Sequence, residues 1–315
     1  MTGATGFIGR HLTAHIAANG DEVRAVVRPS SVTRPLGSDI TVVSSPLEQN
    51  ALMDAFRDVD VVVHLAGVLS ARRDRDYAAT NVEGTRAVAR AARAVSARLV
   101  HVSSLAAAGP APAPAPRRES DPPAPITAYG RSKLDAERVV AGVDALRWTI
   151  LRPAAVYGPG DRAMLPLFRF AARGVLPLVG RTTAAYTLVH VGDVVRAIAA
   201  AVAQEIDGET MFVGHAAATT AREILEGVRT AVGRRAVIVR IPAALTRVAA
   251  VAGDLAGAVR GRPLPLNSSR YAELSAEGFV CSVDRLRERL GIVAKIGLHE
   301  GLEETAAWYA RNGWL

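Results

Sequence analysis

Three glycines spaced by three residues stand in the stretch Thr2-Gly3-Ala4-Thr5-Gly6-Phe7-Ile8-Gly9, directly before a segment with helical periodicity. Glycine at such positions allows a tight turn, the close approach of backbone N–H groups to a pyrophosphate, and close packing of a helix on a sheet. Glycines near a helix start are a weak signal on their own. Their weight depends on the pattern that follows them.

Short apolar runs alternate with helical segments through the first half of the chain. The runs predict strands at 22–27, 40–43, 60–65, 98–102 and 148–151, and the periodic segments predict helices at 7–19, 76–94 and 128–140. Strands that are rich in valine along their whole length are typical of a parallel sheet covered on both faces. The pattern therefore predicts an α/β fold, a Rossmann-type doubly wound parallel sheet.

The second half is less regular and predicts a smaller, mostly helical substrate domain. Helices are expected near 165–173, 191–202, 221–232, 243–259 and 299–311. We expect residues 1–153 to form a dinucleotide-binding domain to which 183–214 return, and 154–182 with 215–315 to form the substrate domain. The proline-rich segment 109–125 is expected to be irregular, either a mobile rim of the active site or a surface linker with polyproline character.

The glycine-rich turn lacks the strand that normally precedes it, because only Met1 stands before Thr2. A central strand missing from a sheet would expose apolar neighbours at a large free-energy cost. We therefore expect the natural start to lie upstream of Met1, or the chain to have been trimmed. An intact mass of the natively produced protein that matches residues 1–315 would contradict this hypothesis.

The composition excludes several classes of protein. Apolar residues make up 50% and charged residues 22%, which argues against disorder. A single cysteine, Cys281, excludes an internal disulfide framework and a multi-cysteine metal site. The sequence contains neither an uncharged apolar run long enough to span a membrane nor a secretory leader. We predict a soluble, cytoplasmic protein.

Two further kinds of site are disfavoured. The net charge of +8 comes mostly from arginines spread along the chain, and the 5% of aromatic residues do not alternate with them, so nucleic-acid binding is not expected. His64, His101 and His190 fall on apolar strand or strand-end patterns, which makes them core or loop histidines rather than metal ligands. No metal site is expected.

The chain resembles the extended short-chain dehydrogenase/reductase family, also described as NAD-dependent epimerase/dehydratase. The matching motifs keep the order of the family along the chain. They are Thr2-Gly3-Ala4-Thr5-Gly6-Phe7-Ile8-Gly9, His64-Leu65-Ala66-Gly67, Asn81-Val82-Glu83-Gly84-Thr85, Ser103-Ser104, Tyr129-Gly130-Arg131-Ser132-Lys133, Leu151-Arg152-Pro153, Val156-Tyr157-Gly158-Pro159-Gly160-Asp161 and His190-Val191-Gly192-Asp193-Val194. Dihydroflavonol reductases and 3β-hydroxysteroid dehydrogenases are the most similar members in character.

The resemblance implies an acid–base centre built on Tyr129 and Lys133. The two residues are four apart on a predicted helix and so lie on one face. Tyr129 would exchange a proton with the carbonyl or alcohol oxygen, and a nearby ammonium would stabilise its phenolate. Ser104 would hydrogen-bond the reacting oxygen, although a serine pair at a strand end can also be a helix cap. Asn81 could kink its helix or order a water.

The resemblance also implies which residues contact the cofactor. Besides Tyr129 and Lys133, these are Gly3, Thr5, Gly6, Phe7, Ile8, Gly9, Leu65, Ala66, Gly67, Ser103, Pro153 and Val156.

Arg28 follows the second predicted strand, where enzymes that use NAD usually place Asp or Glu. A guanidinium pairs with a 2′-phosphate, which a carboxylate would repel. We therefore predict NADP(H), with NAD as the alternative and a solvated strand-end arginine as the simplest other reading of Arg28. The family's Gly-Asp-Leu after the third strand is replaced by Ser45-Pro46-Leu47, so the adenine contacts there must differ.

Two departures from the family pattern concern the substrate. Ala155 stands where nucleotide-sugar enzymes carry Asn, and Tyr186 stands where they tend to carry a diphosphate-binding Arg. The leading hypothesis is an NADP(H)-dependent oxidoreductase that acts on a carbonyl or secondary alcohol of a moderately hydrophobic small molecule. The alternatives are a nucleotide-sugar epimerase or dehydratase that retains NAD, and a non-catalytic cofactor-binding regulator. The resemblance implies a homodimer through the helices at 76–94 and 128–140.

Overall fold

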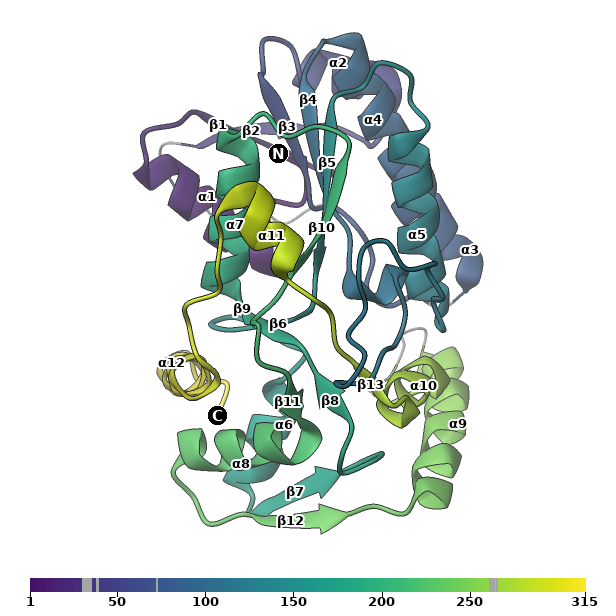
Figure 1. Cartoon of the computed structure of the whole chain (residues 1–315), viewed down its shortest axis with the longest axis vertical. Coiled ribbons are helices and arrows are strands. Elements are labelled where there is room, and N and C mark those ends of the chain that lie inside the picture. Colours follow the sequence, from purple (N-terminus) through teal and green to yellow (C-terminus); the bar gives the residue numbers. More distant parts are fainter. Residues whose placement is uncertain (30–35, 38–39, 72, 261–263, 265) are drawn as a thin grey trace.

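The computed structural model describes residues 1–29, 36–37, 40–71, 73–260, 264 and 266–315 (Figure 1). Its main sheet is parallel throughout, and it confirms the predicted Rossmann-type fold. In spatial order the strands are β2 (Ile40–Ser44), β1 (Val23–Val27), β3 (Val61–His64), β4 (Arg98–Val102), β5 (Trp148–Pro153) and β10 (Glu209–Val213).

Thr2 joins the two parts of this sheet. It forms parallel bridges to Val26 of β1 and to His64 of β3. Its N–H donates to the Val63 carbonyl at 3.0 Å, and its own carbonyl accepts from the Leu65 N–H at 3.2 Å. Within the described residues, the place of the strand expected ahead of the glycine turn is therefore held by Met1 and Thr2, which lead directly into the turn.

Helices cover both faces of the sheet, as the valine-rich strands predicted. One face carries α1 (Phe7–Ala18), α7 (Val191–Ala203) and α11 (Asp284–Leu290), and the other carries α2 (Gln49–Ala55), α4 (Gly84–Ala94) and α5 (Ala128–Ala141). Side chains alternate between the faces along each strand, so Val63 packs in the first layer and its neighbour Val62 in the second.

The long helix expected at 76–94 is divided into three parts. The α-helix α3 (Asp74–Tyr77) leads into a π-helix, η1 (Ala78–Glu83), which continues as α4. A π-helical turn inside a helix is uncommon and often lies at a functional site. It contains the buried Asn81, the residue at which the sequence suggested a kink.

A second group of elements packs below the sheet in Figure 1 around its own apolar core. Its strand pairs are β6 (Ala155–Tyr157) with β9 (Leu188–His190), and β7 (Val175–Leu178) with β12 (Val237–Arg240). A small sheet combines β8 (Ala185–Tyr186), β11 (Thr219–Thr220) and β13 (Gly278–Phe279). The helices are α6 (Leu165–Ala172), α8 (Ala221–Val232), α9 (Ala243–Arg260), α10 (Ser268–Ser275) and α12 (Leu298–Arg311). None of the helices that the structure describes is long and apolar enough to span a bilayer.

The two groups of elements interleave along the chain. Strand β10 pairs with β5 in the main sheet, within the segment 183–214 that was expected to return there. Helix α11 also packs against the main core, through Leu286 and Leu290, whereas the sequence analysis placed all of 215–315 in the other domain. We propose the division into a dinucleotide-binding and a substrate domain on this basis, with α11 belonging to the first.

The proline-rich segment 109–125 has no helix or strand, as expected, but it is fastened to the chain at 278–282. Ala111 and Arg117 form parallel bridges to Phe279 and Cys281. Four backbone hydrogen bonds of 2.8–3.1 Å accompany these bridges. The segment is therefore held against the chain at 278–282 and is not a free linker.

Candidate active site

The glycine-rich turn packs so closely that two of its glycines have no room for a side chain. Gly3 has a φ of 74°, and a Cβ there would lie 2.7 Å from the Ala66 backbone nitrogen. A Cβ on Gly9 would lie 2.2 Å from the Gly3 carbonyl oxygen. Gly6 is the N-cap of α1 and provides no side-chain cap. The first backbone N–H groups of the helix are therefore available to an anion, which is the cradle that a pyrophosphate requires.

A buried hydrogen-bonded chain supports the turn from below. The Thr85 hydroxyl donates to the Asn81 carbonyl at 2.6 Å, so it accepts from His64 Nε2 at 2.9 Å. His64 Nδ1 then accepts from the Thr2 hydroxyl at 2.7 Å. This arrangement requires a neutral imidazole. Burial, with the charge of Lys133 as a smaller cause, lowers the pKa of His64 to about 3.

The other two histidines predicted to be core or loop residues, His101 and His190, are also buried in the fold. His101 lies beside His64, with the ring centroids 5.2 Å apart, and burial holds its pKa well below the usual value. His190 accepts from the Gly192 N–H at 3.2 Å and so caps α7. The described part of the chain contains no cluster of His, Cys, Asp and Glu that could hold a metal ion.

Tyr129 lies in the first turn of α5, beside the end of β4. Thr127 caps this helix by accepting from the Gly130 N–H at 3.1 Å. A Cβ on Gly130 would lie 2.4 Å from the Ala106 carbonyl oxygen, so glycine lets the helix approach the loop after β4. That approach brings Tyr129 to Ser104, and the two side chains are hydrogen-bonded. Ser104 also accepts from the Ala106 N–H, so it is both a cap and a partner of the phenol.

Burial raises the pKa of Tyr129 to about 12, against the opposing effect of the Ser104 hydrogen bond. The sequence suggested that Lys133 would lower this pKa. In the structure the Lys133 ammonium donates instead to the Val102 carbonyl at 2.9 Å. Burial lowers the pKa of Lys133 to about 8, and Glu137 opposes this change. The positive charge of an oxidised nicotinamide, when bound, would favour the phenolate further.

A buried ion pair lies one turn further along α5. Arg152 donates to the two carboxylate oxygens of Glu137 at 3.0 and 2.6 Å, and both side chains are less than a tenth exposed. Ser103 donates its hydroxyl proton to the same carboxylate. The predicted cofactor contact of Ser103 is thus not made by a free hydroxyl, because its proton is committed to Glu137. The sequence analysis did not identify Glu137. Its position four residues after Lys133, which places both side chains on one face of the helix, could have indicated it.

Asn81 connects three parts of the site. Its carboxamide accepts from the Val68 N–H at 2.8 Å and donates to the Val68 carbonyl at 3.1 Å. It also donates to the Ser132 hydroxyl at 3.0 Å, next to Lys133. A Cβ on Gly67 would come within 3.1 Å of its oxygen. Asn81 therefore fixes the loop after β3 against α5.

Arg28 lines a surface cavity of about 360 Å³ at the end of β1. The other lining residues come from the chain after β2 and from the region where η1 meets α4. They are Pro29, Pro46, Leu47, Ala79, Thr80, Glu83 and Gly84. The segment that replaces the family's Gly-Asp-Leu thus supplies apolar surface opposite a guanidinium. These groups fit an adenosine with a 2′-phosphate.

Two charged side chains that the sequence analysis missed lie near Tyr129 on the substrate side. Arg270 and Glu273 are three residues apart on α10 and form an ion pair of 3.0 Å. Both charges act on the half-buried Tyr186, whose pKa burial raises, and Glu273 also acts on Tyr129. Both residues lie far along the chain from every recognised motif, and only the packing of α10 brings them here.

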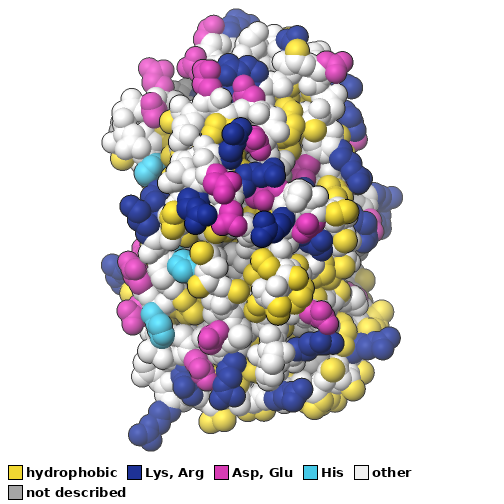
Figure 2. Space-filling view, in the orientation of Figure 1, with side chains coloured by type: hydrophobic (Ala, Val, Ile, Leu, Met, Phe, Trp, Pro, Cys, Tyr) yellow, Lys and Arg dark blue, Asp and Glu magenta, His cyan; other side chains and the backbone are white. Residues whose placement is uncertain are grey.

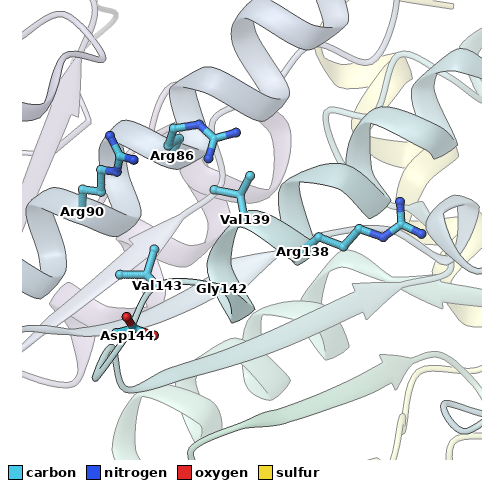
Figure 3. A pocket seen from close by; sticks show the side chains of 7 residues that line it. All are labelled: Arg86, Arg90, Arg138, Val139, Gly142, Val143 and Asp144. Atoms are coloured by element: carbon cyan, nitrogen blue, oxygen red, sulfur yellow. The ribbon is translucent and has the colours of Figure 1, made fainter.

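A second surface cavity, of about 420 Å³, lies away from this site on the outer side of α4 and α5 (Figure 3). Its lining is mainly basic and aliphatic. The residues are Arg86, Arg90, Arg138, Val139, Gly142, Val143 and Asp144. They include no nucleophile or acid–base pair, so this cavity has no evident part in the chemistry.

The fold thus gathers most of the predicted residues at one edge of the sheet. Four of them lie at or just after the carboxyl end of a strand. Gly3 follows Thr2, which bridges β1 and β3, Leu65 follows β3, Ser104 lies two residues after β4, and Pro153 is the last residue of β5. Val156 lies in β6, just beyond. Ligands of open parallel sheets bind at this edge. The predicted NADP position of Arg28 is at the same edge, after β1.

The chain is similar to known proteins over most or all of its length. A family model described as the NAD dependent epimerase/dehydratase family matches residues 1–214. The ceramide reductase of Caulobacter vibrioides is 32% identical over 321 residues, which cover 100% of this chain and 95% of that protein. The dTDP-6-deoxy-L-talose 4-dehydrogenase (NAD(P)(+)) of Kitasatospora kifunensis is 34% identical over 243 residues, covering 72% of this chain and 76% of that protein. The solved structure of MoeE5 in complex with UDP-glucuronic acid and NAD has a TM-score of 0.76 and 25% identity, and covers 99% of this chain and 98% of that one.

Proposed function

The chain belongs to the NAD-dependent epimerase/dehydratase family and is an NAD(P)-dependent oxidoreductase, and from this premise we propose that it interconverts a ketone and a secondary alcohol on a moderately hydrophobic small molecule with NADP(H). The observation that carries the chemistry is the hydrogen-bonded pair Ser104–Tyr129 beside the buried Lys133. A phenol, a hydroxyl and an ammonium are the groups that such a reaction needs around its oxygen.

Each of these residues has a defined task in the reduction. Ser104 donates a hydrogen bond to the carbonyl oxygen and orients it toward Tyr129. Tyr129 would deliver its phenolic proton to that oxygen, and the chemistry that a bound nicotinamide would supply is the hydride for the carbonyl carbon. The Lys133 ammonium, which gives one of its protons to the Val102 carbonyl, would use the others to bind the ribose hydroxyls of the cofactor, and its charge would favour the phenolate from there. In the oxidation the same proton returns to Tyr129.

NADP(H) is favoured over NAD(H) by the cavity at Arg28. A guanidinium faces a surface of proline and leucine there, and the acidic residue typical of NAD enzymes is absent from the end of β1. Glu83 also lines the cavity, but its carboxylate is paired with Arg86 at 3.0 Å. Arg28, which makes no ion pair among the described residues, is the side chain free to take a 2′-phosphate.

A hydrophobic substrate is favoured by Ala155 and Tyr186, which replace an amide and a guanidinium of nucleotide-sugar enzymes. Ala155 is exposed on β6, and Tyr186 is half-buried on β8. The similarity to a ceramide reductase over the full chain supports the same substrate class. The substrate would be a ketone or an alcohol carried on an apolar body.

Arg270 favours a second candidate, a nucleotide-sugar epimerase or dehydratase with retained NAD. Its guanidinium lies close to Tyr186 and could bind a diphosphate from α10 instead of β8. The dTDP-6-deoxy-L-talose 4-dehydrogenase is named for a nucleotide sugar, and the solved structure of MoeE5 is a complex with UDP-glucuronic acid and NAD. A non-catalytic regulator is the third candidate.

We also propose a homodimer and a cytoplasmic location. The outer side of α4 and α5 is open to solvent around the cavity of Figure 3, where a second subunit could pack. Cys281 is free and buried, which suits a reducing compartment. A sedimentation velocity experiment with Arg90→Glu as the interface variant tests the dimer.

The proposed function is tested by the consumption of NADPH and NADH over a panel of apolar ketones, with UDP- and dTDP-sugars included. We expect NADPH-dependent reduction of apolar ketones, and a loss of kcat of at least about 100-fold in Tyr129→Phe with cofactor affinity retained. Turnover of nucleotide sugars alone, with cofactor that co-purifies, would support the second candidate. Cofactor binding with no turnover, unaltered by Tyr129→Phe, would support the third.

A further inference from the structure

Helix α9 has its small residues buried and its large apolar residues exposed. Thr246, Ala250, Gly253 and Gly257 form its buried side. A Cβ on Gly253 would lie 2.0 Å from the Leu266 carbonyl oxygen, so the small residues serve close packing on the segment that leads into α10. The reverse distribution, large apolar residues inward, is normal for a helix on a globular protein.

The exposed side of α9 is a continuous apolar surface. Its large residues are between 50% and 89% exposed and recur at helical spacing. They are Leu245, Val248, Val251, Leu255 and Val259. The ribbon that precedes α9 in the chain also exposes apolar side chains, because Val237 of β12 pairs with Val175 of β7 and both are exposed, as is Val239. Together these eight residues are called the α9–β12 surface below.

Most of the charges around this surface are positive. The one carboxylate of α9, Asp254, is exposed and accepts hydrogen bonds from Ser268. Residues 227–253 contain five arginines, Arg229, Arg234, Arg235, Arg240 and Arg247. All five are exposed, and in the part of the chain that the structure describes none pairs with a carboxylate, unlike their neighbours Arg222 and Arg270. Figure 2 shows hydrophobic and basic side chains side by side at the lower right and lower edge, where Figure 1 places α9 and β12.

We propose that the α9–β12 surface docks on the face of an anionic lipid bilayer. Apolar side chains on one side of a helix enter the boundary of the acyl chains, while arginines at the rim bind lipid phosphates. The excess of arginines that pair with no described carboxylate selects this occupant over a second copy of the chain, because a symmetric contact through this surface would double that positive charge within one interface. The helix lies on the membrane, since no described helix can cross it.

Docking there would have a consequence for access to the site. Helix α10 packs on α9 and carries Arg270 and Glu273, whose charges reach Tyr186 and Tyr129. The substrate side of the site would thus lie close to the bilayer surface. The docking itself does not depend on the proposed function, but it would supply a hydrophobic substrate directly from the lipid phase.

The test is co-sedimentation of the full chain with vesicles, measured without cofactor or substrate so that the outcome is independent of activity. Vesicles of phosphatidylcholine with phosphatidylglycerol are compared with vesicles of phosphatidylcholine alone, at low and at high salt. We expect binding to the anionic vesicles that weakens with salt. The triple variant Leu245→Gln, Val248→Gln, Leu255→Gln should bind at least about tenfold more weakly.

Two further variants separate the contributions. Arg240→Gln with Arg247→Gln should weaken binding to anionic vesicles by about fivefold per arginine and leave the weak binding to neutral vesicles unaltered. Val42→Gln with Val293→Gln, at exposed valines away from the surface, is the matched control and should bind as the wild type does. Circular dichroism and Tm show whether each variant is folded.

Three results would overturn the proposal. The folded wild type would fail to sediment with anionic vesicles, or the triple variant would sediment as the wild type does. The third is a wild-type dimer in sedimentation velocity that the triple variant abolishes while neither protein binds vesicles, which would make this surface an interface between copies. If the wild type binds anionic vesicles but does not reduce ketones, that result would count against the proposed function only.

Discussion

At the scale of single residues, the site depends on a few buried groups that hold the ones in contact with ligand. Glu137 is the central case, because it is within hydrogen-bonding distance of Ser103 and Arg152 and raises the pKa of Lys133. A carboxylate inside the fold is stable only when it is paired, and Arg152 provides that pair. We regard Glu137 as a positioning residue for Lys133 and the end of β4.

Glu137→Gln should therefore affect both stability and the pH profile. Leaving Arg152 buried beside a neutral amide should lower the free energy of unfolding by about 3–5 kcal/mol. Without the carboxylate the pKa of Lys133 falls further below about 8, so the alkaline loss of kcat should begin at lower pH. Urea unfolding and a kcat–pH profile measure the two effects. Asp135→Asn, on the exposed side of α5, is the control, and an unaltered pH profile in Glu137→Gln would contradict the positioning role.

Arg28 carries the prediction on cofactor choice. Arg28→Ala should raise the KM for NADPH by about tenfold or more, because a charge-assisted hydrogen bond to phosphate is lost, and leave the KM for NADH unaltered. Steady-state kinetics with both cofactors measure this. Arg57→Ala, at an exposed arginine paired with Asp54, serves as the control. Equal effects on the two cofactors would show that Arg28 is a solvated strand-end residue.

At the scale of elements, the close approach of the glycine turn to α1 is the feature that positions the cofactor. Gly9→Ala should lower the free energy of unfolding by about 1–3 kcal/mol, since the new methyl group would overlap the Gly3 carbonyl and force the turn apart. Cofactor affinity should fall with it. Gly297→Ala is the matched control, because nothing lies within 4 Å of its Cβ position. Thermal unfolding and cofactor titration of both variants test this, and equal Tm values would contradict it.

At the scale of the whole molecule, two buried neutral histidines should make stability depend on pH. His64 keeps a pKa of about 3 in the fold and regains about 6.5 on unfolding, and the pKa of His101 is lowered in the same direction. Between these pKa values the unfolded chain binds protons at the two histidines that the folded chain does not bind. This contribution to stability is fully present above pH 6.5 and is lost as the pH falls toward 3, by about 1.4 kcal/mol per pH unit for each histidine.

Urea unfolding at pH 7.5 and 5.5 measures this slope. His101→Leu should reduce it, because neither ring nitrogen of His101 has a hydrogen-bond partner among the described residues and the substitution removes one titrating group. His299→Asn, at an exposed histidine, should leave the slope unaltered. A wild-type free energy of unfolding that is constant between the two pH values would contradict the expectation.

The sequence by itself determined the parallel sheet, its main helices and the family. Strand β4 and helix α8 coincide with the predicted segments. The other predicted strands and helices differ by one or two residues at an end, except the helix expected at 76–94, which is divided into three parts. Strand β10 and helices α2, α10 and α11 were not predicted. Period-2 and period-3.6 patterns are local, so the chain displays them without its tertiary contacts. The glycine turn could be read for the same reason, since a turn of this kind needs particular residues at fixed spacing.

Only the tertiary structure decided which side chains meet. Glu137 pairs with Arg152, 15 residues away in the sequence, and the charge of Glu273 acts on Tyr129, 144 residues away; both depend on how the helices pack. The π-helical turn at Asn81 and the fastening of the proline-rich segment to 278–282 are also long-range effects. The exposed side of α9 could not be predicted either, because a helix rich in alanine and valine has two apolar sides, and close packing through its glycines determines which one is buried.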